Sequence, residues 1–209
     1  MRVAISIFAM LVAGCDGAPI DRGGNRAGAA NLSGAGPALP ETPPAPAAEP
    51  ALTAEGFGPL RIGMSRAEVV KALGEDDDPE AVGGPDPASC DEFRPARAPE
   101  GLLAMIEEGR LTRISLIDGS KVKTDRGLAL GAAAAAVRAA YGPALQAERH
   151  KYEEPPAEYL SVWAKDPPKD ERSPAPATAR GIVYEVAGQG VVRAISAGGP
   201  SILYVEGCA

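Results

Sequence analysis

The sequence predicts an α+β fold made of two degenerate repeats, each with a helix packed on a small antiparallel sheet. Three observations lead to this prediction. A helix signal bounded by glycines occurs twice, and a glycine-bearing pair of strands follows each copy in the same order. Before the first copy, the chain is dominated by Pro, Ala and Gly. The predicted folded domain covers residues 54–209, with repeats at about 56–118 and 124–206.

The N-terminus reads as a lipoprotein signal peptide over residues 1–14. Arg2 precedes an apolar run from Val3 to Ala13, which is shorter than the about 20 residues that a membrane-spanning helix needs. The run ends in the sequence LVAGC, which resembles the bacterial lipobox, where small residues precede a lipidated cysteine. We therefore expect Cys15 to carry the lipid and to become the new N-terminus. An ordinary cleaved signal followed by an unrelated cysteine is the alternative.

Residues 15–53 are predicted to form a disordered tether. Segments such as GAGPALPETPPAPAAEPAL contain almost no large apolar side chains. Such a composition cannot bury enough surface to fold, and proline favours extended backbone. The tether would let the folded domain work at some distance from its membrane.

The first repeat opens with a fully signalled helix. Ser65 and Glu68 have the spacing of a capping box, and Met64 with Val69 fits a hydrophobic staple. Gly74 suits the left-handed position after a helix. These signals predict a helix that begins after Ser65 and ends before Gly74.

The second helix signal lies 68 positions later (131 − 63), in LALGAAAAAVRAAYGP. Ala133 and Ala136 replace the two capping-box residues, so the cap is lost. The alanine run compensates through its high helix propensity. Gly142 and Pro143 predict a firm end, because proline resists helix continuation.

Each helix signal is followed by a predicted hairpin. GLLAMIEEGRLTRIS begins at Gly101 and GIVYEVAGQGVVRAI begins at Gly181, which places Arg113 opposite Arg193 in the alignment of the two copies. Turns are expected at residues 107–110 and 187–190. The second copy is longer, and the segment AKDPPKDERSPAPATAR is expected to absorb the difference as a surface loop.

The stretch IGMSRAEVVKALG resembles the G-M-[ST]-x-x-E/Q-V-x-x-x-L-G motif of the SmpA/OmlA family, which includes the small lipoprotein of the outer-membrane β-barrel assembly machinery. That resemblance implies a helix pair packed on an antiparallel sheet. Tandem copies of such a unit resemble β-lactamase-inhibitor proteins, and the whole chain, including its ending YVEGCA, resembles proteobacterial lipoproteins. The two repeats, the long tether and the cysteine pair depart from the family pattern. The resemblance implies binding rather than catalysis.

Composition and cysteine content exclude several functions. The 209-residue chain has a net charge of −7, so it lacks the basic surface that nucleic-acid binding requires. Two cysteines remain after Cys15, and a disulfide between Cys90 and Cys208 is expected in an exported domain. Two free buried thiols are the alternative. The single His150 and two cysteines have no metal-ligand spacing, so no metal or cofactor is expected.

No catalytic constellation is visible, and we predict that the protein is not an enzyme. His150 lies among charges in ERHKYEE and is expected to be solvated. The near match GMSRA to a nucleophile elbow uses Ser65, which is better explained as a helix cap.

The candidate binding surface is the predicted strand in EYLSVWAK. Tyr159 and Trp163 share one face of this strand, and Leu160 and Val162 share the other. If the aliphatic face packs on the core, the aromatic face is available as an interface anchor. The alternative is that Trp163, the single tryptophan, is itself a core residue.

These observations together predict an exported, lipid-anchored module of the bacterial cell envelope that faces the periplasm, in the inner or the outer membrane. Its predicted function is non-catalytic binding of an envelope protein or scaffolding. The alternative function is that of an enzyme inhibitor or a carbohydrate-binding module that uses the sheet face.

Overall fold

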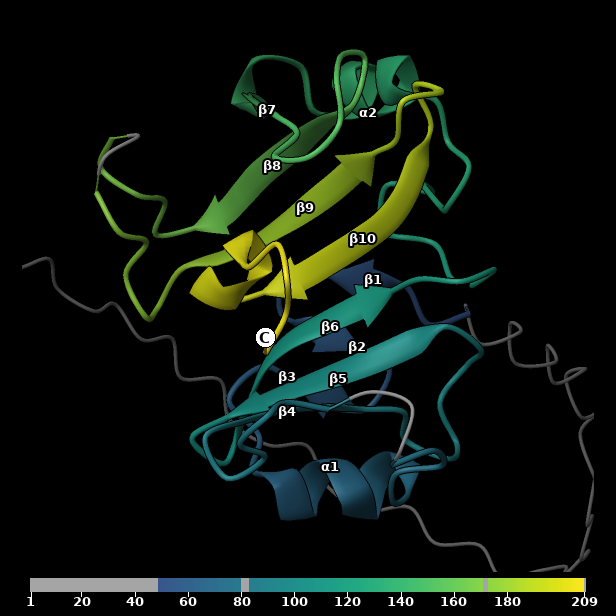
Figure 1. Ribbon diagram of the computed structural model, residues 1–209, viewed down its shortest axis with the longest axis vertical. Coiled ribbons are helices and arrows are strands. Elements are labelled where there is room, and N and C mark those ends of the chain that lie inside the picture. Colours follow the sequence, from purple (N-terminus) through teal and green to yellow (C-terminus); the bar gives the residue numbers. More distant parts are fainter. Residues whose placement is uncertain (1–48, 80–82, 171–172, 209) are drawn as a thin grey trace, which may run out of the picture. The chain divides into compact units, whose positions relative to one another are not determined.

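The computed structural model describes residues 49–79, 83–170 and 173–208. The predicted signal peptide, Cys15 and the tether up to residue 48 lie outside the described residues. The described chain has an α+β fold with two helices, a seven-strand antiparallel sheet and a small three-strand sheet. Figure 1 shows α1 near the β4 end of the large sheet and α2 near its β7 end.

The large sheet has the strand order β4-β5-β6-β10-β9-β8-β7, and every neighbouring pair is antiparallel. Its strands are β4 (Cys90–Phe93), β5 (Leu102–Glu107), β6 (Arg110–Leu116), β7 (Gln146–Arg149), β8 (Glu158–Lys165), β9 (Arg180–Val186) and β10 (Val192–Gly198). Three strands come from the first half of the domain and four from the second. The halves meet where β6 pairs with β10, so the predicted small sheets are parts of one continuous sheet.

The small sheet consists of β1 (Leu52–Thr53), β2 (Gly56–Phe57) and β3 (Leu60–Arg61). The domain therefore starts before residue 54, the predicted boundary. Leu52 has no exposed surface, and its backbone amide donates to the carbonyl of Lys123 at 2.9 Å. The sequence does not indicate a strand here, because a single leucine follows a Pro- and Ala-rich segment. The burial of Leu52 holds β1 against the domain.

Helix α1 spans Arg66–Leu73 and helix α2 spans Ala134–Tyr141, as the capping signals predict. The Ser65 hydroxyl accepts from the Glu68 amide at 3.3 Å, and the Glu68 carboxylate accepts from the Ser65 amide at 2.8 Å. The carboxylate accepts from the Ser65 hydroxyl as well, and the bonds from the Ser65 amide and hydroxyl lower the pKa of Glu68. Helix α2 has no side-chain cap, and a short 3-10 helix, η1 (Gly142–Ala144), follows it directly.

Both helices are joined to their hairpins by the same backbone contacts. At the start of α1, the backbones of Gly63 and Met64 form hydrogen bonds with Leu111, and the Arg66 amide forms one with Gly109. At the start of α2, Gly131 and Ala132 form the same bonds with Val192, and Ala134 forms one with Gly190. The hairpin positions that make these equivalent bonds are 81 apart (192 − 111). This spacing places Ala194 opposite Arg113, whereas the sequence alignment places Arg193 there.

The core lies between the large sheet and the helices. Each helix buries one valine completely, Val69 in α1 and Val137 in α2. Tyr184 of β9 is also fully buried, and its hydroxyl lies 2.8 Å from that of Tyr141. Burial raises the pKa of Tyr184 far above its usual range. The core cluster takes alternate positions along β5, with Leu102, Ala104 and Ile106 among its members. Leu103 and Met105, at the other positions of β5, are also buried.

Candidate binding site

The face of the large sheet that points away from the core carries small side chains. One row crosses five strands in register and consists of Leu103, Ser115, Ser196, Val183 and Ser161. Because serine, valine and alanine side chains fill little space, this row leaves a hollow of about 570 Å³ above the sheet. Such a volume lies within the range of ligand pockets in proteins.

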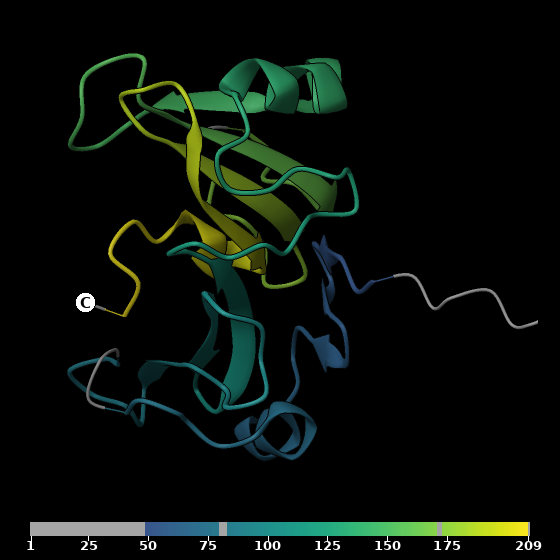
Figure 2. The same cartoon turned by 90° about the vertical axis from the view of Figure 1, so that its right-hand side faces the viewer.

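The C-terminal tail, Gly199–Cys208, forms one wall of the hollow. It begins with the 3-10 helix η2 (Pro200–Leu203). Figure 2 shows the tail, in yellow, on the side of the sheet opposite the three-strand sheet, in dark blue. Gly198 and Gly181 face each other across β10 and β9, and a Cβ atom at Gly181 would lie 3.0 Å from Ile202. Gly181 thus lets η2 approach the sheet closely.

Arg113 holds the middle of the tail. It is 6% exposed, and its guanidinium donates to the carbonyl oxygens of Ser201 at 3.1 Å and Tyr204 at 2.9 Å. The same group forms an ion pair with Glu92 at 2.5 Å. A buried arginine with three partners fixes the path of the tail, since each partner satisfies part of its hydrogen-bonding capacity.

The end of the tail is fixed covalently. A disulfide joins Cys208 to Cys90 in the edge strand β4, with a Cα–Cα distance of 5.5 Å. The bond links residues 118 positions apart, and so ties the last described residue to the first half of the domain. Cys90 and Cys208 are thus joined in the structure as the cysteine count predicts.

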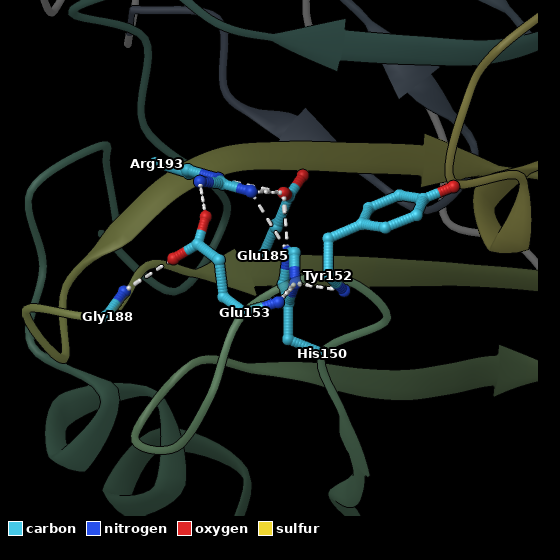
Figure 3. Close-up of polar contacts among 6 residues, drawn as sticks. All are labelled: His150, Tyr152, Glu153, Glu185, Gly188 and Arg193. Carbon is cyan, nitrogen blue, oxygen red and sulfur yellow. Dashed lines mark hydrogen bonds and ion pairs between the residues drawn. The ribbon is translucent and has the colours of Figure 1, made fainter.

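The opposite wall is the loop after β7, and a buried histidine organises it (Figure 3). Backbone amides of Tyr152 and Glu153 donate to Nδ1 of His150 at 3.1 and 3.0 Å. Nε2 of the same ring lies 3.1 Å from the Glu185 carboxylate and 2.9 Å from the Arg193 guanidinium. The prediction that His150 is solvated is wrong: the residue is 7% exposed.

Arg193 connects this loop to the sheet. Its guanidinium pairs with the carboxylates of Glu185 and Glu153, and the Glu153 carboxylate also accepts from the Gly188 amide at 3.0 Å. Hydrogen bonding by Arg193 is the main cause that lowers the pKa of Glu153. Figure 3 shows these groups converging from the loop, β9 and β10. The loop is therefore held in place by charge-assisted hydrogen bonds.

The two walls meet at the mouth of the hollow. The Tyr152 hydroxyl donates to the Glu206 carboxylate of the tail, and Lys151 lies 3.9 Å from the same carboxylate. Tyr204, on the tail, has a raised pKa because of the neighbouring Glu107 carboxylate and partial burial. Loop and tail thus form a continuous rim around the opening.

This rim carries exposed apolar side chains beside its charged ones. Among the described residues, the exposed large hydrophobic side chains are Tyr152 (60%), Tyr204 (48%), Leu203 (44%) and Val205 (41%). All four belong to the two walls, and three are consecutive in the tail. A local concentration of exposed apolar residues is typical of an interaction site.

On the floor of the hollow, the charges of Arg113 and Glu185 are already paired. Arg113 is neutralised by Glu92, and Glu185 by Arg193. The hydroxyls of Ser115 and Ser196 bond to each other at 3.0 Å, and Ser161 is 4% exposed. The hollow is also lined by Glu148, Arg149, Lys151 and Glu206. Its floor therefore suits an uncharged group with both polar and apolar parts.

The predicted binding surface of Tyr159 and Trp163 is less exposed than expected. Leu160 is fully buried on the core face, as its strand position predicts, and Tyr159 is on the opposite face. Tyr159 is half-buried, stacks on His150 at 4.7 Å and lines the hollow. Trp163 is half-buried and packs on Gly181. Neither residue projects freely, and their role in binding stays a prediction.

The residues of the rim could not be predicted from the sequence, because the tail has no periodic hydrophobic pattern. The run SILYVEGC could have been noticed, since four apolar residues between polar ones precede a cysteine that a disulfide would fix. The charges that hold the walls are scattered from Glu92 to Arg193, and only the fold brings them together.

Comparisons with known proteins do not suggest a function, so the function is inferred from the geometry of the hollow and its walls. No protein-family model, curated protein or solved structure matches the chain. Within the described ranges, no group of three or more His, Cys, Asp or Glu side chains could hold a metal ion. None of the described helices is long and apolar enough to cross a membrane. The fold and site define an α+β domain with a walled hollow on its open sheet face.

Proposed function

We propose that this protein is an exported, lipid-anchored module of the bacterial cell envelope that binds another envelope protein without catalysing a reaction. The single observation that carries the binding role is the apolar rim formed by Tyr152 and Leu203–Val205 around the hollow. Exposed aromatic and aliphatic side chains beside a concave surface are the usual anchors of protein interfaces. The sequence LVAGC and the disulfide support the exported, lipid-anchored part of the proposal.

The paired charges inside the hollow support a largely uncharged contact. Arg113 and Glu185 already have partners of opposite sign, so a charged partner group would have to displace one of them. Breaking a buried pair is costly because it leaves a charge without compensation. The partner segment that enters the hollow is therefore neutral, with apolar atoms against Val183 and hydrogen-bonding groups near Ser161.

The domain arose, in this proposal, by duplication of one helix-and-hairpin unit. Two observations support it. The same backbone bonds attach α1 to the first hairpin and α2 to the second. In addition, Ser115 of β6 pairs with Ser196 of β10. The two serines are 81 positions apart (196 − 115), so in the proposed duplication each occupies the position of the other in its own copy. A self-matching pair of this kind is the mark of a two-fold axis between like units.

Site-specific crosslinking in the envelope tests the binding role. A photoreactive residue is placed at Tyr204 on the rim and, as a control, at Ala135 on the exposed side of α2. We expect one defined protein to be captured from Tyr204 and not from Ala135. The variant Val205→Asp should lower that capture at least about ten-fold, because it buries a charge in an apolar contact.

A matched variant completes the test. Ala139→Asp adds the same charge at an exposed position of α2 and should leave capture from Tyr204 unchanged. Equal capture from Tyr204 and Ala135, or insensitivity to Val205→Asp, would refute a binding site at the rim. Capture replaced by retention on envelope polysaccharide would instead favour the carbohydrate-binding alternative.

A further inference from the structure

The tail that walls the hollow is attached at few points. Its first residue, Gly199, donates a backbone hydrogen bond to Thr112 in β6 at 2.9 Å. Beyond this point, the backbone amides of Ile202 and Tyr204 bond within the tail itself. The remaining attachments are the buried side chains of Ser201 and Ile202, the guanidinium of Arg113, the contacts of Glu206 at the mouth, and the disulfide of Cys208. The tail is not a strand of the sheet.

The attachments differ greatly in strength. The contacts of Glu206 are between exposed groups, and exposed ion pairs contribute little to stability. Leu203, Tyr204 and Val205 remain about half exposed, so they gain only part of the free energy of full burial. Arg113 grips the tail up to Tyr204. From residue 205 to the end, the disulfide is the one strong attachment within the described chain.

Building on the proposed function, we propose that the tail is a strap whose closed position depends on the Cys90–Cys208 disulfide. With the disulfide formed, the strap completes the wall and the rim. With the disulfide reduced, the strap opens from its C-terminal end, the hollow loses that wall, and the large sheet stays folded. The binding site then exists only in the oxidised protein.

The chemical step is thiol–disulfide exchange with an external dithiol. One thiolate of the dithiol attacks a sulfur of the disulfide and forms a mixed disulfide, which releases the other cysteine as a thiolate. The second thiol of the reductant then displaces the remaining cysteine. Cys90 and Cys208 gain two electrons and two protons in total, and the dithiol is oxidised to a disulfide.

Opening the strap weakens binding for a clear physical reason. Leu203, Tyr204 and Val205 would have to be ordered during binding instead of beforehand, and ordering side chains and backbone lowers affinity. The floor of small residues would remain, but it would be an open sheet face instead of a hollow. Oxidation state would therefore affect binding more than it affects the fold of the core.

Hydrogen–deuterium exchange of the full chain tests the strap without any partner. The oxidised protein is compared with the same protein in dithiothreitol and with Cys208→Ser. We expect amides from residue 203 to 208 to exchange at least about ten-fold faster in both cases, because local opening is enough to expose them. Amides of β5, β6 and β9 should change less than about two-fold. Dithiothreitol should have no effect on the Cys90→Ser/Cys208→Ser double variant.

Two results would overturn the proposal. Unchanged protection of the tail after reduction would mean that Arg113 and Glu206 suffice to hold it. Faster exchange throughout the sheet would mean that the disulfide supports the whole fold. If Cys208→Ser does not fold, Arg113→Lys with the disulfide intact is the second variant: it should speed exchange at residues 201–204 and leave 207–208 protected.

Crosslinking from Tyr204 tests the redox-dependent strap and the protein-binding role of the rim independently. Capture by the oxidised protein that falls at least about ten-fold on reduction supports both. Capture that is independent of oxidation state supports the binding role and refutes the strap. Tail opening without capture in either state supports the strap and refutes a protein-binding rim.

Discussion

Gly181 lets the tail lie against the sheet. It is on β9, and a Cβ atom there would lie 3.0 Å from Ile202 of η2. Trp163, on the neighbouring strand, lies over Gly181, so the absent side chain is replaced by an aromatic ring and by Ile202. An aromatic residue that covers a strand glycine is a known means of restoring packing there. Trp163 therefore contributes to packing at the end of the hollow.

We predict that Gly181→Ala destabilises the domain. Its new Cβ would lie 2.8 Å from both the Trp163 ring and the Val162 carbonyl oxygen, and the backbone oxygen cannot move away easily. Overpacking of this kind costs about 1–3 kcal/mol of unfolding free energy, which urea denaturation measures. Gly199→Ala is the control, since its nearest neighbour would be 3.6 Å away; a similar loss in both variants would contradict this explanation.

A second prediction at the residue scale concerns Glu153 and acid. Because its pKa is below the ordinary 4.5 in the folded protein, its contribution to stability is present above that value and is lost as the pH falls through the folded pKa. Glu153→Gln should lower the thermal midpoint near neutral pH, and the difference from wild type should shrink below about pH 4. Glu154→Gln, at a 92% exposed side chain, should have no such effect. A pH-independent difference would exclude the ion pair as the cause.

The two helices show how much local signals determine. Their start and end positions were predictable because caps, glycines and proline act on neighbouring backbone groups. The turns at residues 107–110 and 187–190 were predictable for the same reason. Strand partners across the domain were not, because β6 and β10 are far apart in the chain, and no local pattern encodes their pairing.

At the element scale, we predict opposite effects of two capping variants. Ser65→Ala removes the α1 cap and should lower the unfolding free energy by about 1 kcal/mol. Ala133→Ser adds a cap to α2, where the backbone is already extended with φ −67° and ψ 143°, and should raise it by about 0.5–1 kcal/mol. Ala135→Ser, inside α2, is the control and should not stabilise, since serine is a poorer helix former than alanine. Urea denaturation measures all three, and stabilisation by Ala135→Ser would argue against capping.

At the scale of the whole molecule, the site is assembled from distant parts. Its floor comes from both halves of the sheet, one wall from the loop after β7, and the other from the C-terminal tail. Sequence reasoning found the half-buried Tyr159 and the two cysteines, because a strand pattern and a cysteine count are visible in sequence. It missed Arg113, His150 and the rim, because their burial and pairing depend on contacts between segments far apart in the chain.

A further prediction at the scale of the whole molecule concerns the lipid anchor expected at Cys15. Cys15→Ala should abolish incorporation of a fatty-acid analogue and leave the precursor unprocessed, because the modified cysteine is also the predicted cleavage point. Metabolic labelling followed by gel analysis measures both. Cys208→Ser, which changes the other end of the chain, should keep the label. Equal labelling of wild type and Cys15→Ala would remove the lipid anchor from the proposal.

The pairing of β6 with β10 has a consequence for how the chain assembles. Each hairpin closes over a few residues, but the seam between the halves joins Leu116 to Ile195 and must wait for a long loop to close. We therefore expect the halves to condense separately and the seam to form late. A half made alone would leave its last strand as an open edge. If the two halves are copies of one unit, as proposed above, such an edge can pair with a second copy of itself, and we expect one half made alone to form a dimer.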